Sequence, residues 1–346
     1  MIRIGIICPS EIAYRRFLPA VSSLKNRFCY VGVAIANPAE WFGDLSHVTK
    51  EQIENQQSIE QQKVNGFIQD YGGDIFRSYE EMVCSPKIDA IYIPLPPALH
   101  YKWAKYALEQ GKHVMVEKPL TCYLKDTEHL ISIADDRNLA LHENYMFVFH
   151  DQVQAIKNII INEVEVGKPR LYRISFGFPR RAANDFRYNK KLGGGALLDA
   201  GGYTLRYATE LLGSTARIVA ANVTYDSDFE VEIFGAATVV NDEGMIVQTA
   251  FGMDNDYRCD IEIWGNKGTL TSNRILTAPI GFVPTYTLKQ NQEYIRRNLP
   301  EDDAFCKSLL RFANAIEDMS IRTENYKIIE MQASLLESFR NKSGLK

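Results

Sequence analysis

The sequence lacks the features that mark several classes of protein. None of its apolar runs reaches the ~18 residues of a membrane span, and the opening run breaks at a Pro-Ser-Glu step too early for a signal peptide. A net charge of -4 provides no basic surface for nucleic acid. We therefore expect a cytoplasmic protein that binds neither membranes nor nucleic acid.

Cysteine and histidine are scarce where metal binding or acid–base chemistry would need them. The six cysteines lie far apart, with no CxxC pair and no histidine at metal-ligand spacing. We interpret them as free thiols and expect no metal site. All six histidines fall within the first 150 residues. Acid–base work in the second half must therefore use Tyr, Lys or a carboxylate.

The length of 346 residues predicts two domains, because one hydrophobic core stops growing at about 250 to 300 residues. Residues 1–146 alternate apolar runs with amphipathic stretches, which predicts a Rossmann-like, doubly wound parallel α/β sheet for dinucleotide binding. A Gln-rich stretch at 41–70 predicts one solvated helix and an exposed loop. The five predicted strands are 2–7, 30–36, 90–95, 113–119 and 139–147.

A different pattern follows in residues 147–346. Apolar residues alternate along 170–178, and two hairpins are indicated at 235–252 and 260–273. A helix is expected over 194–213. We predict an α+β domain for substrate binding and oligomerisation, with a large, mostly antiparallel sheet whose open face is covered by a second subunit in a homodimer or homotetramer. A C-terminal helix can pack back on the first domain.

The first motif is the turn CPSEIA, residues 8–13, after the first predicted strand. Cys8 and Ser10 replace the first two glycines of the G-x-G-x-x-[GA] pattern, so we expect their side chains to push the phosphates outward. Pro9 removes an N–H donor, although the N-terminus of the next helix still favours an anion. Ser10 can donate its hydroxyl or cap the helix, and the sequence leaves both open.

The sequence predicts NADP as the cofactor, with NAD as an alternative. A carboxylate after the second strand would bind the ribose of NAD and repel the 2′-phosphate of NADP. Asn37 stands there instead, and Glu40 lies further into the loop. Arg15 or Arg16 can join Asn37 at the phosphate, or can be ordinary surface charge. The predicted cofactor-binding residues are Cys8, Pro9, Ser10, Glu11, Ile12, Asn37, Pro94, Leu95, Pro96, His100, Glu117, Lys118 and Asn144.

Two further segments carry candidate chemistry. Lys118 directly follows a strand, where a lysine can be desolvated and aimed into a cleft as a donor; the alternative is a surface lysine. Asp199 and Tyr203 follow the triple glycine 193–195 and are spaced i, i+4, so a helix places them on one face. The alternative for this segment is a flexible, capped start of a helix.

Three arginines precede that helix, at positions 180, 181 and 187. Guanidinium groups match phosphate oxygens, which favours a nucleotide diphosphate sugar as substrate, although loop arginines are also common surface charge. The predicted substrate-binding residues are Arg187, Asp199 and Tyr203, and the predicted catalytic residues are Lys118, Asp199 and Tyr203.

Taken together, GIICPSEIA, QGKHVMVEKPL (110–120) and GGGALLDAGGY (193–203) resemble the Gfo/Idh/MocA oxidoreductases, named after glucose-fructose oxidoreductase and inositol dehydrogenase. The resemblance covers nearly the whole chain apart from 41–63. ENYMFVFH (143–150) and DFRYNKKLGGGALLDAGGYTLR (185–206) are most similar to the sugar-nucleotide C-3 ketoreductases. Trans-dihydrodiol dehydrogenases and NADP-dependent xylose dehydrogenases share some of these traits.

The resemblance implies that Lys118 contacts the reacting oxygen and the nicotinamide ribose, that Asp199 holds substrate hydroxyls, and that Tyr203 replaces the family's histidine. A tyrosine near a cation is an adequate acid, which suits ketone reduction. We expect an NADP(H)-dependent oxidoreductase acting on a keto or hydroxy carbon of a sugar, a nucleotide-linked 3-keto-deoxysugar first. The alternatives are a dehydrogenase of a free aldopyranose or trans-dihydrodiol, and a catalytically silent nucleotide-binding sensor.

Overall fold

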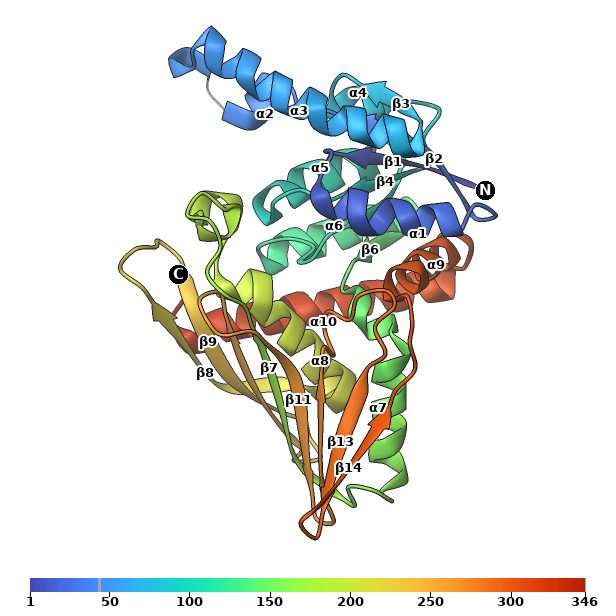
Figure 1. Ribbon diagram of the computed structural model, residues 1–346. Helices are drawn as coiled ribbons and strands as arrows, with labels where there is room; N and C mark the ends of the chain where they lie inside the picture. The colour runs from blue at the N-terminus through green and yellow to red at the C-terminus, as the bar shows by residue number, and fades with distance from the viewer. Residues whose placement is uncertain (43–44, 346) are drawn as a thin grey trace. The chain divides into compact units, whose positions relative to one another are not determined.

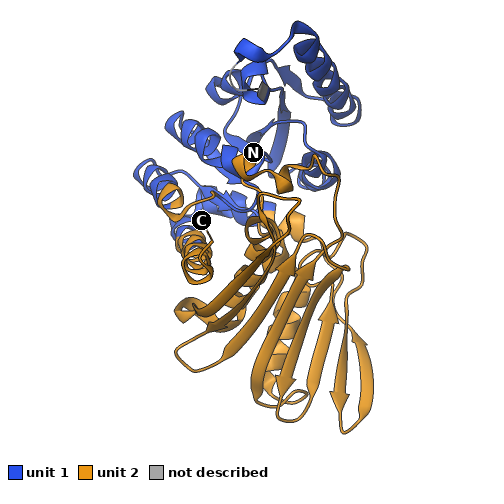
Figure 2. Cartoon of the chain, turned by 90° about the vertical axis from the view of Figure 1, so that its left-hand side faces the viewer, with its two compact units in different colours: residues 1–120, 128–144, 309–326 blue, residues 121–127, 145–308, 327–346 orange. Residues whose placement is uncertain are grey.

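The computed structural model describes residues 1–42 and 45–345. The chain forms two compact units, which Figure 2 distinguishes by colour. Unit 1 comprises residues 1–120, 128–144 and 309–326, and unit 2 comprises residues 121–127, 145–308 and 327–346.

Unit 1 is built on a six-stranded parallel sheet in the order β3-β2-β1-β4-β5-β6 (Figure 1). The order reverses between β1 and β4, which is where open α/β sheets bind ligands at the carboxyl ends of their strands. All five predicted strands are present. β3 was missed because two of its three residues are exposed, so it forms no apolar run. The strands are β1 (Ile2–Ile7), β2 (Phe28–Ala34), β3 (Asp74–Phe76), β4 (Ala90–Ile93), β5 (His113–Val116) and β6 (Leu141–Glu143).

Helices connect these strands. The predicted helix in the Gln-rich stretch is confirmed as α3, which begins with a reciprocal cap: Gln52 N–H donates to Thr49 Oγ1 at 3.2 Å, and Thr49 N–H donates to Gln52 Oε1 at 2.9 Å. Residues 43–44 of that stretch lie outside the described residues. The helices are η1 (Ala13–Phe17), α1 (Leu18–Ser23), α2 (Pro38–Phe42), η2 (Leu45–His47), α3 (Lys50–Tyr71), α4 (Tyr79–Cys84), α5 (Pro97–Glu109) and α6 (Leu124–Asp136).

The chain returns to unit 1 near its C-terminus, through α9 (Ala304–Glu317) and the first part of α10 (Met319–Ser343). Phe312 packs on the ring of His142 at 5.9 Å between centroids. Arg322 donates a 2.7 Å hydrogen bond to the carbonyl of Asn138. These contacts cover the end of the sheet that carries β6, so residues late in the chain complete a fold that its first residues begin.

Unit 2 contains an eight-stranded sheet in the order β14-β13-β12-β11-β7-β10-β9-β8. β7 and β10 are parallel, and every other pair is antiparallel. Both predicted hairpins are confirmed, and the fold class predicted for the chain is confirmed with them. The strands are β7 (Pro169–Gly177), β8 (Arg217–Tyr225), β9 (Glu232–Val240), β10 (Ile246–Gly252), β11 (Arg258–Gly265), β12 (Thr269–Asn273), β13 (Thr285–Gln290) and β14 (Glu293–Asn298).

The core of unit 2 lies on one face of this sheet. Tyr172, Ile174 and Phe176 of β7 are buried, as their alternation predicts, and the helices pack against this face (Figure 1). The other face carries Arg173, which is paired with Glu262 across the strands at 2.8 Å. The helices are η3 (Met146–Phe149), α7 (Asp151–Asn162), η4 (Phe186–Tyr188), η5 (Lys190–Leu192), η6 (Leu197–Gly201), α8 (Gly202–Leu212) and η7 (Gly213–Thr215).

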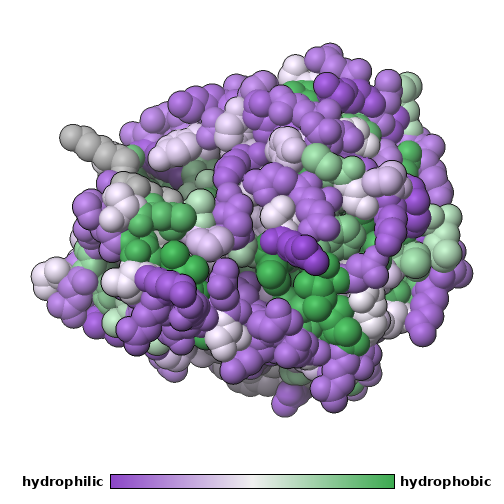
Figure 3. All heavy atoms as spheres, turned by 90° about the horizontal axis from the view of Figure 1, so that it is seen from above, coloured by the Kyte–Doolittle hydropathy of each residue, from purple (hydrophilic) through white to green (hydrophobic). Residues whose placement is uncertain are grey.

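Within the part of the chain that the structure describes, no helix combines the length and the apolar character needed to span a bilayer. Figure 3 shows one face of the molecule, on which hydrophilic side chains predominate and hydrophobic side chains form separate patches.

Candidate active site

The turn after β1 has the left-handed backbone that a glycine usually adopts, although no glycine stands there. Cys8 has a φ of 80°, a left-handed conformation that costs a residue with a side chain about 1–2 kcal/mol. Its N–H donates to the Ala34 carbonyl of β2 at 3.1 Å. Burial raises the pKa of its thiol to about 12. The expectation that the side chains of this turn push the phosphates outward stays a prediction.

Ser10 is the cap of the helix that follows this turn. Its Oγ accepts the N–H of Ala13 at 3.2 Å, and its carbonyl accepts the N–H of Tyr14 at 3.1 Å. Of the two roles that the sequence leaves open, the structure shows capping. The N–H groups of Glu11 and Ile12 are the remaining donors of the first helical turn, where an anion is favoured.

The end of β2 presents no carboxylate for a ribose. Asn37 accepts the N–H of Glu40 on its Oδ1 at 3.1 Å and so caps α2. The Glu40 side chain is only 9% exposed and is paired with Lys102 at 2.6 Å. Trp103 donates its Nε1–H to the same carboxylate at 3.2 Å. Glu40, the nearest acid after β2, is thus already neutralised by Lys102. A site without a free carboxylate suits the 2′-phosphate of NADP.

The predicted phosphate-binding role of Arg15 gains no support from its contacts. Arg15 is exposed and pairs with Glu11 one helical turn earlier, at 2.6 Å. This is the arrangement of an ordinary surface ion pair, which contributes little to stability.

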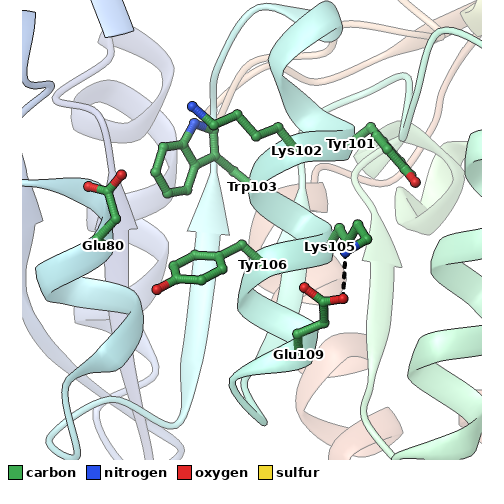
Figure 4. Close-up of a pocket in the computed structure, with 7 residues that line it drawn as sticks. All are labelled: Glu80, Tyr101, Lys102, Trp103, Lys105, Tyr106 and Glu109. Carbon is green, nitrogen blue, oxygen red and sulfur yellow. Dashed lines mark hydrogen bonds and ion pairs between the residues drawn. The ribbon is translucent and has the colours of Figure 1, made fainter. Parts of the chain in front are cut away.

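An open pocket of about 400 Å³ lies on the α4–α5 surface of unit 1 (Figure 4). Lys105 and Glu109 of its wall form an ion pair. None of the predicted site residues lines it, and we assign it no part in the reaction. Its lining residues are Glu80, Tyr101, Lys102, Trp103, Lys105, Tyr106 and Glu109.

His100 joins the two loops that follow β4 and β5. Its ring is fully buried, with Nε2 at 2.6 Å from the carbonyl of Leu95 and Nδ1 at 2.8 Å from that of Pro119. Burial lowers its pKa to about 4, while the two carbonyls favour the protonated ring. Both ring nitrogens are engaged inside the protein, where they hold the Pro94–Pro96 loop and the Lys118 loop. The predicted part of His100 in cofactor binding stays a prediction.

Lys118 is half-buried at the carboxyl end of β5, and the residue before it is firmly held. Glu117 Oε1 accepts the hydroxyl of Tyr92 at 2.6 Å and the Nδ2–H of Asn144 at 2.7 Å. Burial raises the pKa of Glu117. The Tyr92 ring stacks on Phe17 at 4.0 Å. Tyr92 was missed at the sequence level, although a tyrosine within the buried strand AIYI was a signal.

Asp199 belongs to a closed ring of hydrogen bonds in unit 2. Arg187 Nε donates to Asp199 Oδ2 at 2.7 Å, the Asp199 N–H donates to the Gly195 carbonyl at 3.2 Å, and the Gly195 N–H donates to the Arg187 carbonyl at 2.9 Å. Asp185 adds a second carboxylate to Arg187 at 3.1 Å. The charge of Arg187 is therefore offset, and its observed contacts hold Asp199.

The three predicted phosphate-binding arginines differ in their contacts. Arg180 is surrounded by acids, with Asp254 at 2.8 Å, Asp228 at 3.2 Å and Asp226 at 3.5 Å. The guanidinium of Arg181 lies 5.1 Å from the ring centroid of Phe178. Among the described residues no carboxylate forms an ion pair with Arg181, so its charge is the one best suited to a diphosphate.

Tyr203 lies in the first turn of α8, within a group of aromatic rings. The centroids of Tyr145, Phe147 and Phe176 lie 5.3, 5.8 and 5.2 Å from its own. Gly202 permits this packing, because a Cβ there would collide with the Tyr145 hydroxyl. The rings restrict the orientation of the Tyr203 side chain, and no local sequence pattern predicts that they gather around it.

The Cys8 turn yields a test with a matched pair of variants. Cys8→Val places a β-branched side chain at positive φ, so we expect the free energy of unfolding to fall by about 1–3 kcal/mol. We also expect the dissociation constant for NADPH to rise about tenfold, whereas Cys8→Gly keeps it within about threefold of the wild type. Nicotinamide fluorescence titration and urea denaturation measure both. Wild-type NADPH affinity in Cys8→Val would contradict the role assigned to the turn.

Comparison with known proteins places the chain in a family. Residues 26–145 match the family described as "Oxidoreductase family, NAD-binding Rossmann fold", and residues 153–271 match the "GFO/IDH/MocA C-terminal domain". The first match begins after the CPSEIA turn, consistent with the departure of that turn from the usual pattern.

Relatives of the chain match it over nearly their full length. A dTDP-3,4-didehydro-2,6-dideoxy-alpha-D-glucose 3-reductase from Actinomadura kijaniata is 32% identical, covering 98% of this chain and 95% of its own. One from Streptomyces violaceoruber is also 32% identical, covering 99% and 96%. The crystal structure of KijD10, a 3-ketoreductase from Actinomadura kijaniata in complex with NADP and TDP-benzene, matches with a TM-score of 0.87 and 31% identity over 99% of this chain and 98% of its own.

These similarities confirm the predicted family and enzyme class. With its Rossmann sheet, its lysine after β5 and its aspartate and tyrosine at the start of α8, the chain belongs to the Gfo/Idh/MocA family of nicotinamide-dependent oxidoreductases.

Proposed function

We propose that this protein is an NADP(H)-dependent reductase of the 3-keto group of a dTDP-linked deoxysugar. The observation that carries the proposal is the full-length similarity to reductases of that name, together with a solved relative that holds NADP and TDP-benzene. The chain keeps chemistry-bearing residues in both units, Lys118 in unit 1 and Asp199 with Tyr203 in unit 2.

The residues around the turn after β1 fit a dinucleotide phosphate. Cys8 keeps the left-handed turn, and Glu11 and Ile12 supply N–H donors at a helix start. Asn37 would offer an uncharged amide to the ribose, while Glu40 is neutralised by Lys102. NADPH, when bound, supplies the hydride for the reduction.

The protein's own groups supply the proton and the positioning. The Lys118 ammonium polarises the ketone oxygen and stabilises the charge that develops on it. Tyr203, oriented by its aromatic neighbours, donates the proton to that oxygen. Asp199, fixed by Arg187, accepts a hydrogen bond from a sugar hydroxyl. The same groups serve the reverse reaction.

Replacement of the two proposed acid–base groups tests the reaction. We expect Tyr203→Phe to lower kcat about 10²- to 10⁴-fold, with NADPH affinity unchanged, and Lys118→Met to lower kcat at least as much. Loss of NADPH absorbance with dTDP-3,4-didehydro-2,6-dideoxy-α-D-glucose measures both. Wild-type turnover in the double variant would refute the assignment, and NADPH binding without any turnover of the wild type would favour the silent sensor.

Cofactor choice is tested at Asn37. We expect Asn37→Asp to place a carboxylate against the 2′-phosphate and to reduce the preference for NADPH over NADH about tenfold. Asn37→Ser is the matched control, since serine also caps a helix but adds no charge. Fluorescence titrations with both nucleotides provide the ratio. An unchanged ratio of NADPH to NADH affinity in Asn37→Asp would show that residues other than Asn37 recognise the 2′-phosphate.

Arg181 distinguishes a nucleotide-linked sugar from a free aldopyranose or dihydrodiol. Because Arg187 holds Asp199, its removal would disturb both kinds of substrate. We expect Arg181→Ala to raise the KM for the dTDP-sugar about tenfold, as loss of a charge-assisted hydrogen bond does, with little change in kcat. Arg170→Ala, at the other end of β7, is the control. An unchanged KM for the dTDP-sugar would show that Arg181 does not bind the diphosphate.

We further propose that the open face of the unit 2 sheet joins two copies of the chain. This face exposes Trp264 (52%) and Val219 (47%), and small residues such as Ala236 line a hollow of about 340 Å³ on it. Such a face is typically covered. Light scattering should give at least twice the mass of one chain, and Ala236→Arg should lower it. A wild-type mass of one chain would contradict the proposal.

A further inference from the structure

A buried carboxylate outside the proposed chemistry contacts the helix start that carries Asp199. Glu232, the first residue of β9, is 5% exposed. Its Oε1 accepts the N–H of Leu197 at 2.9 Å. Burial raises the pKa of this carboxyl, although the Leu197 N–H favours the charged form. A buried acid must have a partner to compensate its desolvation, and here the partner is a helix N-terminus.

The segment that Glu232 caps has unusual winding. Leu197–Gly201 is π-helical and contains Asp199, and α8 continues directly from it with Tyr203. The first N–H groups of a helix have no partner within it, and a negative group is favoured there. No side chain from the helix itself caps this start. The cap is thus provided from a strand that follows the helix in sequence.

Gly195 lies so close to the Glu232 carboxylate that no side chain fits at this position. Its φ is 113°, a conformation reserved for glycine. A Cβ at this position would lie 2.5 Å from Glu232 Oε1. The same glycine accepts the N–H of Asp199 and donates to the Arg187 carbonyl. The carboxylate and the hydrogen-bonded ring therefore meet at one residue, where movement of either would disturb the other.

We propose that Glu232 is a positioning residue that holds the π-helical turn and thereby fixes Asp199 and Tyr203 for the reaction. A π-helical turn is rarely stable alone and is retained where its surroundings impose it. Without the Glu232 carboxylate, the turn relaxes toward ordinary α winding, which rotates Asp199 away from Arg187. The kinetic part of this inference rests on the proposed function, whereas the structural part does not.

Three variants test the inference in the full chain. In Glu232→Ala we expect kcat for dTDP-3,4-didehydro-2,6-dideoxy-α-D-glucose to fall about 10- to 100-fold, as for small displacements of a catalytic group. The KM for NADPH should stay within about threefold, because the nucleotide candidates lie in unit 1. Glu232→Gln keeps an oxygen for Leu197 and should retain most of kcat. Glu230→Ala, at an exposed acid two residues earlier, should match the wild type.

Hydrogen–deuterium exchange of peptides covering 195–203 gives a readout that needs no substrate. We expect faster exchange in Glu232→Ala and wild-type exchange in Glu230→Ala. Wild-type kcat in Glu232→Ala, or an equal loss of kcat in Glu232→Gln and Glu232→Ala, would overturn the positioning role. If Glu232→Ala does not fold, Glu232→Gln decides through its kcat and exchange. A wild type that leaves the sugar unreduced overturns the proposed function, while exchange still decides whether Glu232 holds the turn.

Discussion

The nucleotide end of unit 1 depends on the left-handed backbone of Cys8. That conformation lets the chain leave β1 and enter a helix within three residues, with Ser10 capping the helix. A cysteine is smaller than most alternatives, and burial raises the pKa of its thiol. Its N–H donates to the Ala34 carbonyl of β2, and this contact helps to compensate the local strain in a turn that lacks the usual glycines.

The candidate catalytic side chains are held in place by hydrogen bonds of the residues around them. Tyr92 and Asn144 hold Glu117 immediately before Lys118, and His100 holds the carbonyl of Pro119 immediately after it. Arg187 does the same for Asp199. Each reactive side chain is therefore flanked by buried, hydrogen-bonded neighbours, which is how an enzyme keeps a few atoms within a fraction of an ångström of where they are needed.

Sequence reasoning found the elements that carry a local pattern. Five of the six strands of unit 1, the two hairpins of unit 2, and the placement of Lys118 after a strand and of Asp199 and Tyr203 on a helix could be predicted. The strands β13 and β14 were missed because they are rich in polar residues, β14 being exposed along its whole length. β8 was also missed, although most of its residues are apolar. The protein contacts of His100 and Arg187 could not be predicted for another reason. A histidine or arginine near a cleft has the same sequence signature whether it meets a ligand or a neighbouring backbone.

The return of residues 309–326 to unit 1 has a consequence for biosynthesis. The ribosome makes the six-stranded sheet early, yet the helical segment that covers its β6 end emerges only after nearly all of unit 2 has been translated. The nucleotide-binding unit therefore cannot be completed vectorially from its N-terminus. Its last contacts, such as that of Arg322 with Asn138, form only after residues 145–308 of unit 2 have been made. A chain stalled or cleaved before residue 309 would carry an unfinished first unit beside a nearly finished second one.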